Sequence, residues 1–149
     1  AGGKVDAKLT GGDGRGKSAI HLASYYGGIE IVRALLNAGV DVNSPPEGGG
    51  LTALHWAAYN KHHGLLTFLL ESGADANIQA DGIYQQRSPL HFAVAADSED
   101  MVRLLLEYDA NPLLKDREGT TPIDIALERF AETAHPRYKR MIKLLESFI

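Results

Sequence analysis

The 149-residue sequence contains no cysteine and no long hydrophobic run. Without cysteine the chain can form neither a disulfide framework nor a thiolate metal site or nucleophile. No stretch reaches the roughly 18 consecutive apolar residues that a membrane-spanning helix needs. The formal net charge of −4 provides no general attraction to phosphate backbones or anionic lipids. We therefore expect a globular chain whose partners are neither nucleic acids nor membranes.

One six-residue phrase occurs four times along the chain. Its copies occupy Ser18–Ala23, Thr52–Ala57, Ser88–Ala93 and Thr121–Ala126, so that successive copies begin 34, 36 and 33 residues apart. A fixed period of about 20 to 50 residues is typical of repeat architectures. In such proteins each unit is too small to bury its apolar face alone and does so by stacking on its neighbours.

An apolar segment and a turn follow each of the first three copies at a constant distance. The segments are Ile31–Leu36, Leu65–Leu70 and Met101–Leu106, and the turns begin at Gly39, Gly73 and Asp109, each 21 residues after its copy begins. A Ser or Thr suits the cap of a helix, Pro89 and Pro122 suit its first turn, and Gly suits a left-handed helix end. The sequence predicts two helices per repeat, with the variation in length confined to the connecting loops.

This phrase, period and turn resemble the ankyrin-repeat family over roughly residues 13–149. The resemblance implies an all-α solenoid of helix-turn-helix units with β-hairpin-like finger loops. We expect residues 1–12 to be a leader or the remnant of a preceding finger. The expected repeats are 13–46, 47–79, 80–114 and 115–149, the last with the character of a C-terminal cap. In that repeat, about six additional residues around 132–137 are expected to separate the two helices.

Three histidines, His21, His55 and His91, recur once per repeat and are candidate metal ligands. Packed helices lie on the order of 10 Å apart, whereas zinc nitrogen ligands approach the ion to about 2 Å. Three such histidines cannot share one ion, and we expect no metal site. The family resemblance implies instead that each one bonds the backbone of a neighbouring turn. Asp124 replaces histidine in the fourth copy, and His62 and His63 are expected to be solvent-exposed.

Residues 11–18 match the phosphate-loop pattern G-x-x-x-x-G-K-[ST]. The chemistry of that loop needs a buried strand before it and an acidic residue for Mg²⁺, but residues 4–10 are short and half polar. Gly16 and Ser18 fall in register with the repeat, which leaves only Lys17 unexplained. Nucleotide binding through Gly11–Ser18 is therefore a remote alternative. No other catalytic pattern is present in the sequence, and we expect no catalytic residue, no enzyme activity and no cofactor.

The positions that the repeat leaves free form the candidate binding surface. In the family that the chain resembles, finger loops and a concave face lined by first helices usually carry binding. Four of the six tyrosines fall at free positions, and Tyr and Arg are enriched at interface hot spots. Trp56 matches Leu22 and Phe92 of other copies and is predicted to lie in the core. The predicted partner-binding residues are Arg15, Lys17, Tyr25, Tyr26, Leu51, Tyr59, Asn60, Ile83, Tyr84, Gln85, Arg87, Arg117, Glu118, Glu128 and Arg129.

These observations favour a non-catalytic protein–protein interaction module that is monomeric by itself. A cytoplasmic location is expected, with nuclear and periplasmic locations as alternatives. The alternative function is a substrate- or partner-recruiting domain of a larger enzyme or signalling protein, since the sequence begins with Ala1 rather than Met. A run of basic residues in the last helix is interpreted as capping, with a docking patch for an acidic partner as the alternative. That run consists of Arg137, Lys139, Arg140 and Lys143.

Overall fold

A computed structural model describes residues 19–45 and 49–149 of the chain. The described residues form pairs of helices joined by loops. The first helices of the pairs are α1 (Ala19–Tyr25), α3 (Ala53–Tyr59), α5 (Pro89–Ala95) and α7 (Pro122–Thr133), and the second helices are α2 (Ile29–Asn37), α4 (His63–Glu71), α6 (Glu99–Glu107) and α8 (Pro136–Glu146). Finger loops join the pairs: the second finger lies between α2 and α3, the third between α4 and α5, and the fourth between α6 and α7. A 3₁₀ turn, η1 (Gly82–Tyr84), lies in the third finger. Within these ranges no helix combines the length and the apolar character needed to cross a membrane.

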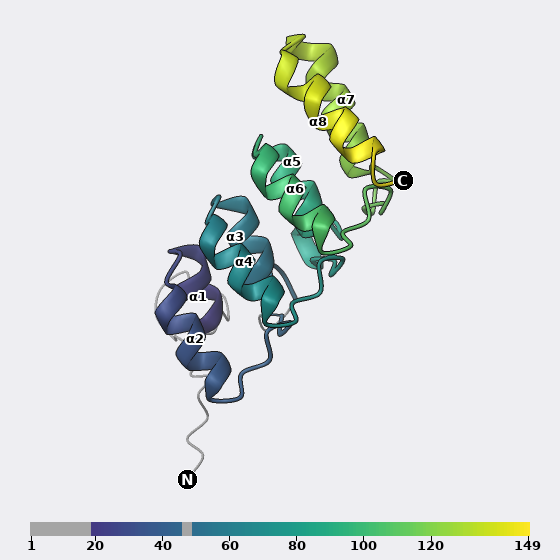
Figure 1. Ribbon diagram of the computed structural model, residues 1–149. Helices are drawn as coiled ribbons and strands as arrows, with labels where there is room; N and C mark the ends of the chain where they lie inside the picture. Colours follow the sequence, from purple (N-terminus) through teal and green to yellow (C-terminus); the bar gives the residue numbers. More distant parts are fainter. Residues whose placement is uncertain (1–18, 46–48) are drawn as a thin grey trace.

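The helix pairs stack side by side, with α1 and α2 at one end and α7 and α8 at the other (Figure 1). First helices contact first helices in series, and second helices contact second helices, which gives two layers. The expected all-α solenoid is confirmed. The hairpin-like form of the fingers is seen in the loop between α4 and α5, where Ala80 and Arg87 form one antiparallel bridge, and no strand is formed by the described residues. Other backbone groups of the finger loops form hydrogen bonds to side chains instead. The backbone amides of Glu118 and Thr120, for example, donate to the carboxylate of Asp116.

The second, third and fourth copies of the repeated phrase each start their helix with a reciprocal cap between the first and fourth residues of the phrase. The backbone N–H of Thr52 donates to Nδ1 of His55 at 3.2 Å, and the hydroxyl lies 2.8 Å from the same nitrogen. The third repeat has the same arrangement, at 3.1 and 2.8 Å. In the fourth repeat, the Asp124 carboxylate accepts hydrogen bonds from the backbone N–H and from the hydroxyl of Thr121. This arrangement satisfies polar groups that a helix start otherwise leaves unpaired.

The recurring histidines link each repeat to the next finger. Nε2 of His21, His55 and His91 lies 2.8, 3.0 and 3.0 Å from the carbonyls of Ser44, Arg87 and Thr120, respectively. Because Nδ1 of His55 accepts from an amide, Nε2 carries the proton and donates. Burial lowers the pKa of His55 to about 4 and also lowers the pKa of His91. The predicted linking role is confirmed. Across the described part of the chain, no three His, Asp or Glu side chains gather as they would around a metal ion.

Two asparagines make a second series of links between repeats. Nδ2 of Asn77 donates to the carbonyl of Asp109 at 2.9 Å, and its Oδ1 accepts from the amide of Asn111 at 2.7 Å. Asn43 joins the first repeat to the turn of the second in the same way, at 3.4 and 2.8 Å. Leu113 occupies the corresponding position of the third repeat and is 48% exposed. This series therefore ends before the last helix pair.

The core lies between the two layers and between successive pairs. Its recurring members include Ile20, Leu54, Leu90 and Ile123, which occupy the same position of the four phrases and are all buried. Trp56 is 8% exposed, so the prediction that it belongs to the core is confirmed. Fully burying one large apolar side chain contributes about 1.5–3 kcal/mol. Stacking on neighbours thus stabilises helix pairs that are too small to fold separately.

The fourth repeat differs from the others in the length of its first helix. This helix, α7, has 12 residues, whereas α1, α3 and α5 have 7 each. The expectation of a longer connection around 132–137 was wrong, because strong helix formers follow Ala126 and α7 absorbs the extra residues. Ala134 ends α7 in the left-handed conformation, with φ 51°. His135 then caps α8 by accepting from the amide of Arg137.

Candidate partner-binding surface

Two columns of residues lie at the ends of α1, α3 and α5 and at the corresponding positions within the longer α7, where the repeat does not fix the residue type. The first column is Tyr25, Tyr59, Ala95 and Glu128, and the second is Tyr26, Asn60, Ala96 and Arg129. Tyr26 is 72% exposed, Tyr59 54% and Tyr25 38%. Neither column carries a charge before the fourth repeat. The surface along these columns is therefore aromatic in the first two repeats, small in the third and charged in the fourth.

An aromatic row joins the exposed tyrosines to the core. It consists of Tyr26, Tyr25, Trp56, Tyr59, Phe92 and Tyr84, whose successive ring centroids lie 4.9, 5.2, 6.3, 6.0 and 6.4 Å apart in edge-to-face contacts. Such contacts contribute about 0.5–1.5 kcal/mol each beyond the area that they bury. Trp56 and Phe92 form the buried base of the row. The sequence analysis missed these contacts, because they depend on side-chain directions across repeats.

The third finger presents an exposed isoleucine on a strained but well-bonded loop. Ile83 in η1 is 78% exposed. Gln85 and Gln86 both have left-handed backbones, with φ 56° and 58°, a conformation that costs a non-glycine residue on the order of 1 kcal/mol. The amide of Gln86 donates to the carbonyl of Ala80 at 2.8 Å, and the Gln79 side chain donates to the carbonyl of Gln86 at 2.7 Å. These bonds hold the finger in one shape.

The third and fourth fingers are bonded to each other. Nε2 of Gln85 donates to Oε1 of Glu118 at 2.9 Å, and the amide of Arg117 donates to the carbonyl of Gln85 at 2.8 Å. Nε of Arg87 lies 3.2 Å from Oδ2 of Asp116, whose side chain is buried. Burial alone would raise the pKa of Asp116, but hydrogen bonds from its own finger and from Arg87 outweigh burial and hold that pKa below its ordinary value. Four predicted contact residues thus also maintain the finger pair.

The remaining predicted residues differ in accessibility. Leu51 is only 2% exposed, so its prediction as an accessible finger-tip residue was wrong: the side chain turns into the core. Asn60 is half-buried and donates to the carbonyl of Trp56 at 3.2 Å. Arg129 pairs with Glu132 at 3.8 Å. Arg15, Lys17 and the phosphate-loop pattern of residues 11–18 lie outside the described residues.

His62 supports the first two tyrosines and is less free than the sequence suggested. Its Nε2 lies 2.8 Å from the carbonyl of Tyr25, the last residue of α1. Its ring also lies over Gly27, where an added Cβ would come within 2.8 Å of Nδ1. The expected solvent exposure is therefore found for His63 but not for His62, which is half-buried because its side chain connects two repeats. The signal in the sequence was the glycine that makes room for it.

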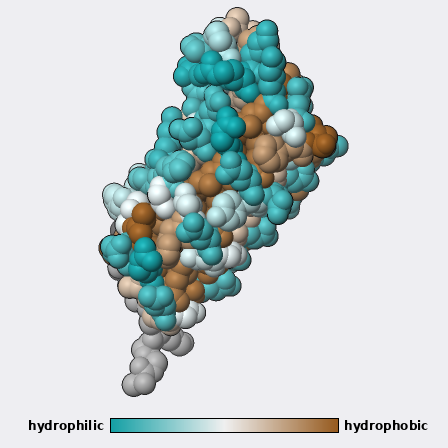
Figure 2. All heavy atoms as spheres, in the orientation of Figure 1, coloured by the Kyte–Doolittle hydropathy of each residue, from teal (hydrophilic) through white to brown (hydrophobic). Residues whose placement is uncertain are grey.

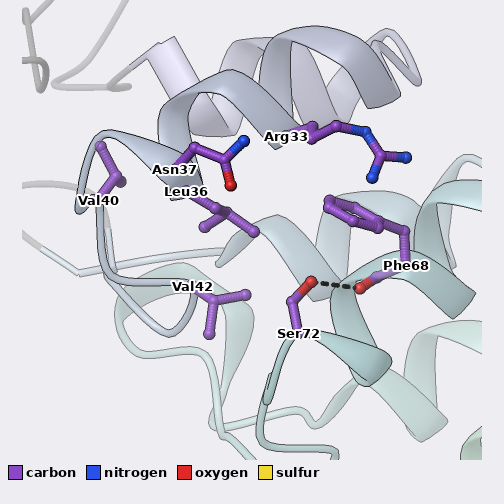
Figure 3. A pocket seen from close by; sticks show the side chains of 7 residues that line it. All are labelled: Arg33, Leu36, Asn37, Val40, Val42, Phe68 and Ser72. Atoms are coloured by element: carbon purple, nitrogen blue, oxygen red, sulfur yellow. Dashed lines mark hydrogen bonds between the residues drawn. The ribbon is translucent and has the colours of Figure 1, made fainter.

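A pocket that the sequence analysis missed lies between α2 and α4 (Figure 3). At one side of the pocket, the guanidinium of Arg33 lies 4.5 Å from the ring centroid of Phe68. Ser72 lies at its rim, and the residue at the same position of the next repeat is the much larger Tyr108. The pocket has a volume of about 490 Å³ and is lined by Arg33, Leu36, Asn37, Val40, Val42, Phe68 and Ser72. On the face drawn in Figure 2, hydrophobic residues form separate patches bordered by hydrophilic residues.

Half of the basic run in α8 is bound to the third repeat. Arg137 forms an ion pair with Asp97, and Nε of Arg140 lies 3.3 Å from Oε2 of Glu99. Lys139 is exposed. Exposed ion pairs contribute up to about 1 kcal/mol each. These pairs support the interpretation of α8 as a cap and weaken the alternative of a docking patch for an acidic partner.

Stacked helix pairs, linked by histidines and asparagines and bearing an exposed row of side chains, define a helical-repeat solenoid. The chain belongs to the ankyrin-repeat family: a family model described as ankyrin repeats (3 copies) matches residues 3–80, and one described as ankyrin repeats (many copies) matches residues 79–126. The resemblance found in the sequence is confirmed. Ankyrin repeats generally mediate protein–protein interactions, and the family is generally non-catalytic.

Two curated proteins show the context in which similar repeats occur. The chain is 35% identical over 127 residues to the E3 ubiquitin-protein ligase hecd-1 of Caenorhabditis elegans, a match that covers 85% of this chain and 3% of that protein. It is 46% identical over 43 residues to the B-cell lymphoma 3 protein homolog of Mus musculus, covering 29% of this chain and 10% of that protein. The chain thus spans a small fraction of the length of either relative.

Proposed function

We propose that the chain binds a protein partner, without catalysis, through the aromatic row and the tip of the third finger. The observation that carries this proposal is the exposure of Tyr25, Tyr26 and Tyr59 at positions that the repeat leaves free. Tyrosine supplies a large, fairly rigid contact area with a polar tip, at a low cost in conformational entropy. Ile83 extends this surface with an apolar side chain held on a fixed loop.

The bonding around the row supports its use as a preformed surface. Edge-to-face contacts hold the tyrosine rings, His62 holds the end of α1, and the third finger is bonded to the fourth. Association is weakened by every side chain and loop that must become ordered. A surface that is already ordered avoids much of this cost. An interface of standard size would bury about 800 Å² of this chain.

The direct test replaces Tyr26 and Tyr59 together by alanine and measures partner capture by affinity purification with quantitative mass spectrometry. We expect capture to fall at least tenfold while the far-ultraviolet circular dichroism spectrum is unchanged. Tyr108→Ala is the matched control, because Tyr108 is 37% exposed but lies outside the aromatic row. If the folded double variant captured its partner as well as the control does, the row would not be the binding surface.

We propose further that the chain works as a recruiting module within a larger enzyme or signalling protein. The support is the length of its relatives, of which it matches only 3% and 10%. In such a protein, the row would hold a substrate or a partner near an activity located elsewhere. Sequencing the natural transcript tests this, since the proposal requires an open reading frame that continues into a further domain. A transcript that encodes no such domain would contradict it.

A further inference from the structure

We propose that the occupant of the aromatic row is a proline-rich segment in the polyproline II conformation, with a basic residue at the end that faces the fourth repeat. This inference rests on the proposed function, because it uses the same surface. A polyproline II segment has a fixed rise, forms no internal hydrogen bonds and leaves its carbonyls free. Its spacing, its hydrogen-bonding groups and its charge can each be compared with the row.

The spacing of the row matches one turn of polyproline II. Tyr25 and Tyr59 occupy the same position in successive repeats, and ring contacts of 5.2 and 6.3 Å through Trp56 keep their centroids within about 12 Å of each other. Packed helices lie about 8–10 Å apart. Three residues of polyproline II span about 9 Å, whereas side chains on one face of an extended strand recur at about 7 and 13 Å. The rise of about 9 Å over three polyproline II residues falls within the separation of packed helices, so prolines at i and i+3 match successive repeats more closely than strand residues do.

The chemistry of the surface also suits this occupant. Proline rings pack on aromatic side chains in known modes of polyproline II recognition, and the row exposes tyrosine rings in two repeats. The hydroxyls of Tyr26 and Tyr59 are donors that can reach free carbonyls, and the Asn60 amide has two protons, of which the Trp56 carbonyl accepts one. An α-helix also places residues i and i+7 about 10.5 Å apart. Its carbonyls are already bonded internally, however, so they offer these donors less acceptor capacity than the unbonded carbonyls of polyproline II.

The first column fixes where a charge belongs on the occupant. Tyr25, Tyr59 and Ala95 carry no charge, and the column ends at Glu128, which is exposed. No ion pair of Glu128 is seen among the described residues, whereas the neighbouring Arg129 pairs with Glu132. With three residues of the occupant for each repeat, the residue opposite Glu128 lies six residues from the one on Tyr59. A lysine or arginine there would meet an available carboxylate.

A ten-residue peptide with prolines at positions 1, 4 and 7 and arginine at position 10 provides the first test, titrated into the chain by isothermal calorimetry. We expect Tyr59→Ala to weaken binding at least tenfold and Tyr59→Phe, which keeps the ring, to weaken it less. Tyr108→Ala should leave binding unchanged. Glu128→Gln should weaken the arginine peptide about threefold and leave a peptide with alanine at position 10 unaffected. Equal or tighter binding of a peptide with prolines at 1, 3 and 5, or of a helical peptide with leucines at i and i+7, would overturn the inference.

A second experiment separates failure of this inference from failure of the proposed function. A photo-crosslinking residue, Tyr59→p-benzoylphenylalanine, is placed in the chain, and mass spectrometry identifies the segment that it captures in native extract, with the same replacement at Tyr108 as the control. Capture of a segment with prolines three residues apart, at Tyr59 only, supports both proposals. Capture of a segment without that spacing overturns the inference and leaves the proposed function standing. Absence of any capture specific to Tyr59 contradicts both.

Discussion

Removing the imidazole of His55 should destabilise the fold far more than removing an exposed histidine. His55 is fully buried, accepts from the Thr52 amide at 3.2 Å and lies 3.0 Å from the carbonyl of Arg87. In His55→Ala both backbone groups lose their partner, and a buried group without a partner costs about 1–3 kcal/mol. With the cavity added, we expect a loss of about 3–5 kcal/mol, a large part of the stability of a typical domain.

The same residue makes stability depend on pH in a direction that the structure specifies. Burial lowers its pKa from 6.5 to about 4, against the opposing effect of hydrogen bonds to the carbonyls of Arg87 and Ile78. Between these pH values the unfolded chain binds a proton that the folded chain does not. Stability present above pH 6.5 is therefore lost as the pH falls, by about 3 kcal/mol at pH 4 for this one group. Below pH 4 His55 adds only about 0.4 kcal/mol to this loss, because the folded chain then binds the proton as well.

Urea unfolding at several pH values, followed by circular dichroism, tests both statements. At pH 7.5 we expect His55→Ala to be less stable than the unmodified chain by the full 3–5 kcal/mol, and His63→Ala, which removes an exposed side chain, to be within about 0.5 kcal/mol of it. At pH 5 the deficit of His55→Ala should shrink by about 2 kcal/mol, because only the unmodified chain still loses stability through His55. His91 is present in both proteins, so its own contribution to the pH dependence cancels when their free energies of unfolding are subtracted. Parallel pH profiles, or a deficit below 1 kcal/mol at pH 7.5, would refute this account of the histidine links.

Three further predictions concern the other links between repeats. Asn77→Ala removes two hydrogen bonds to the next turn and should lower the free energy of unfolding by about 1–3 kcal/mol, whereas Leu113→Ala, at the same position one repeat later, should change it by less than about 1 kcal/mol in the same urea titration. Ser72→Tyr should fill the pocket between α2 and α4 and raise the melting temperature by a few degrees; an unchanged or lower value would mean that the pocket does not accept the ring. A double-mutant cycle on Arg140 and Glu99 should give a coupling energy below about 1 kcal/mol that decreases in high salt, and a larger salt-independent value would contradict the view of this pair as exposed.

The parts of the fold that were predictable are those that each repeat specifies for itself. The caps at Thr52 and Thr121, the burial of Trp56 and the left-handed helix ends at Gly39 and Gly73 all follow from local sequence. They recur at fixed positions, so one copy explains the next. The roles of the histidines came from the family resemblance, because their partners lie in another repeat.

The parts that were not predictable depend on contacts between repeats or on local strain. Leu51 has the sequence context of a finger tip, and only the path of the second finger turns it into the core. The left-handed backbones of Gln85 and Gln86 oppose intrinsic preference and exist because neighbouring groups bond to them. The pocket beside Phe68 arises from the small side chain of Ser72, whose effect becomes visible only when two helices are placed together.

The histidine links also determine where this protein can change in length. Each histidine is hydrogen-bonded to a backbone carbonyl at the base of the next finger. For His21 this is the carbonyl of Ser44, at the start of the second finger, and for His55 it is the carbonyl of Arg87, at the end of the third. The histidine bonds therefore position the helices through the bases of the fingers. We expect residues inserted beside the exposed Ile83 to leave the helix pairs at their present spacing, provided that the bonds of Gln85 to the fourth finger are kept. A designer who wished to change what this chain binds would extend a tip and leave the histidines in place.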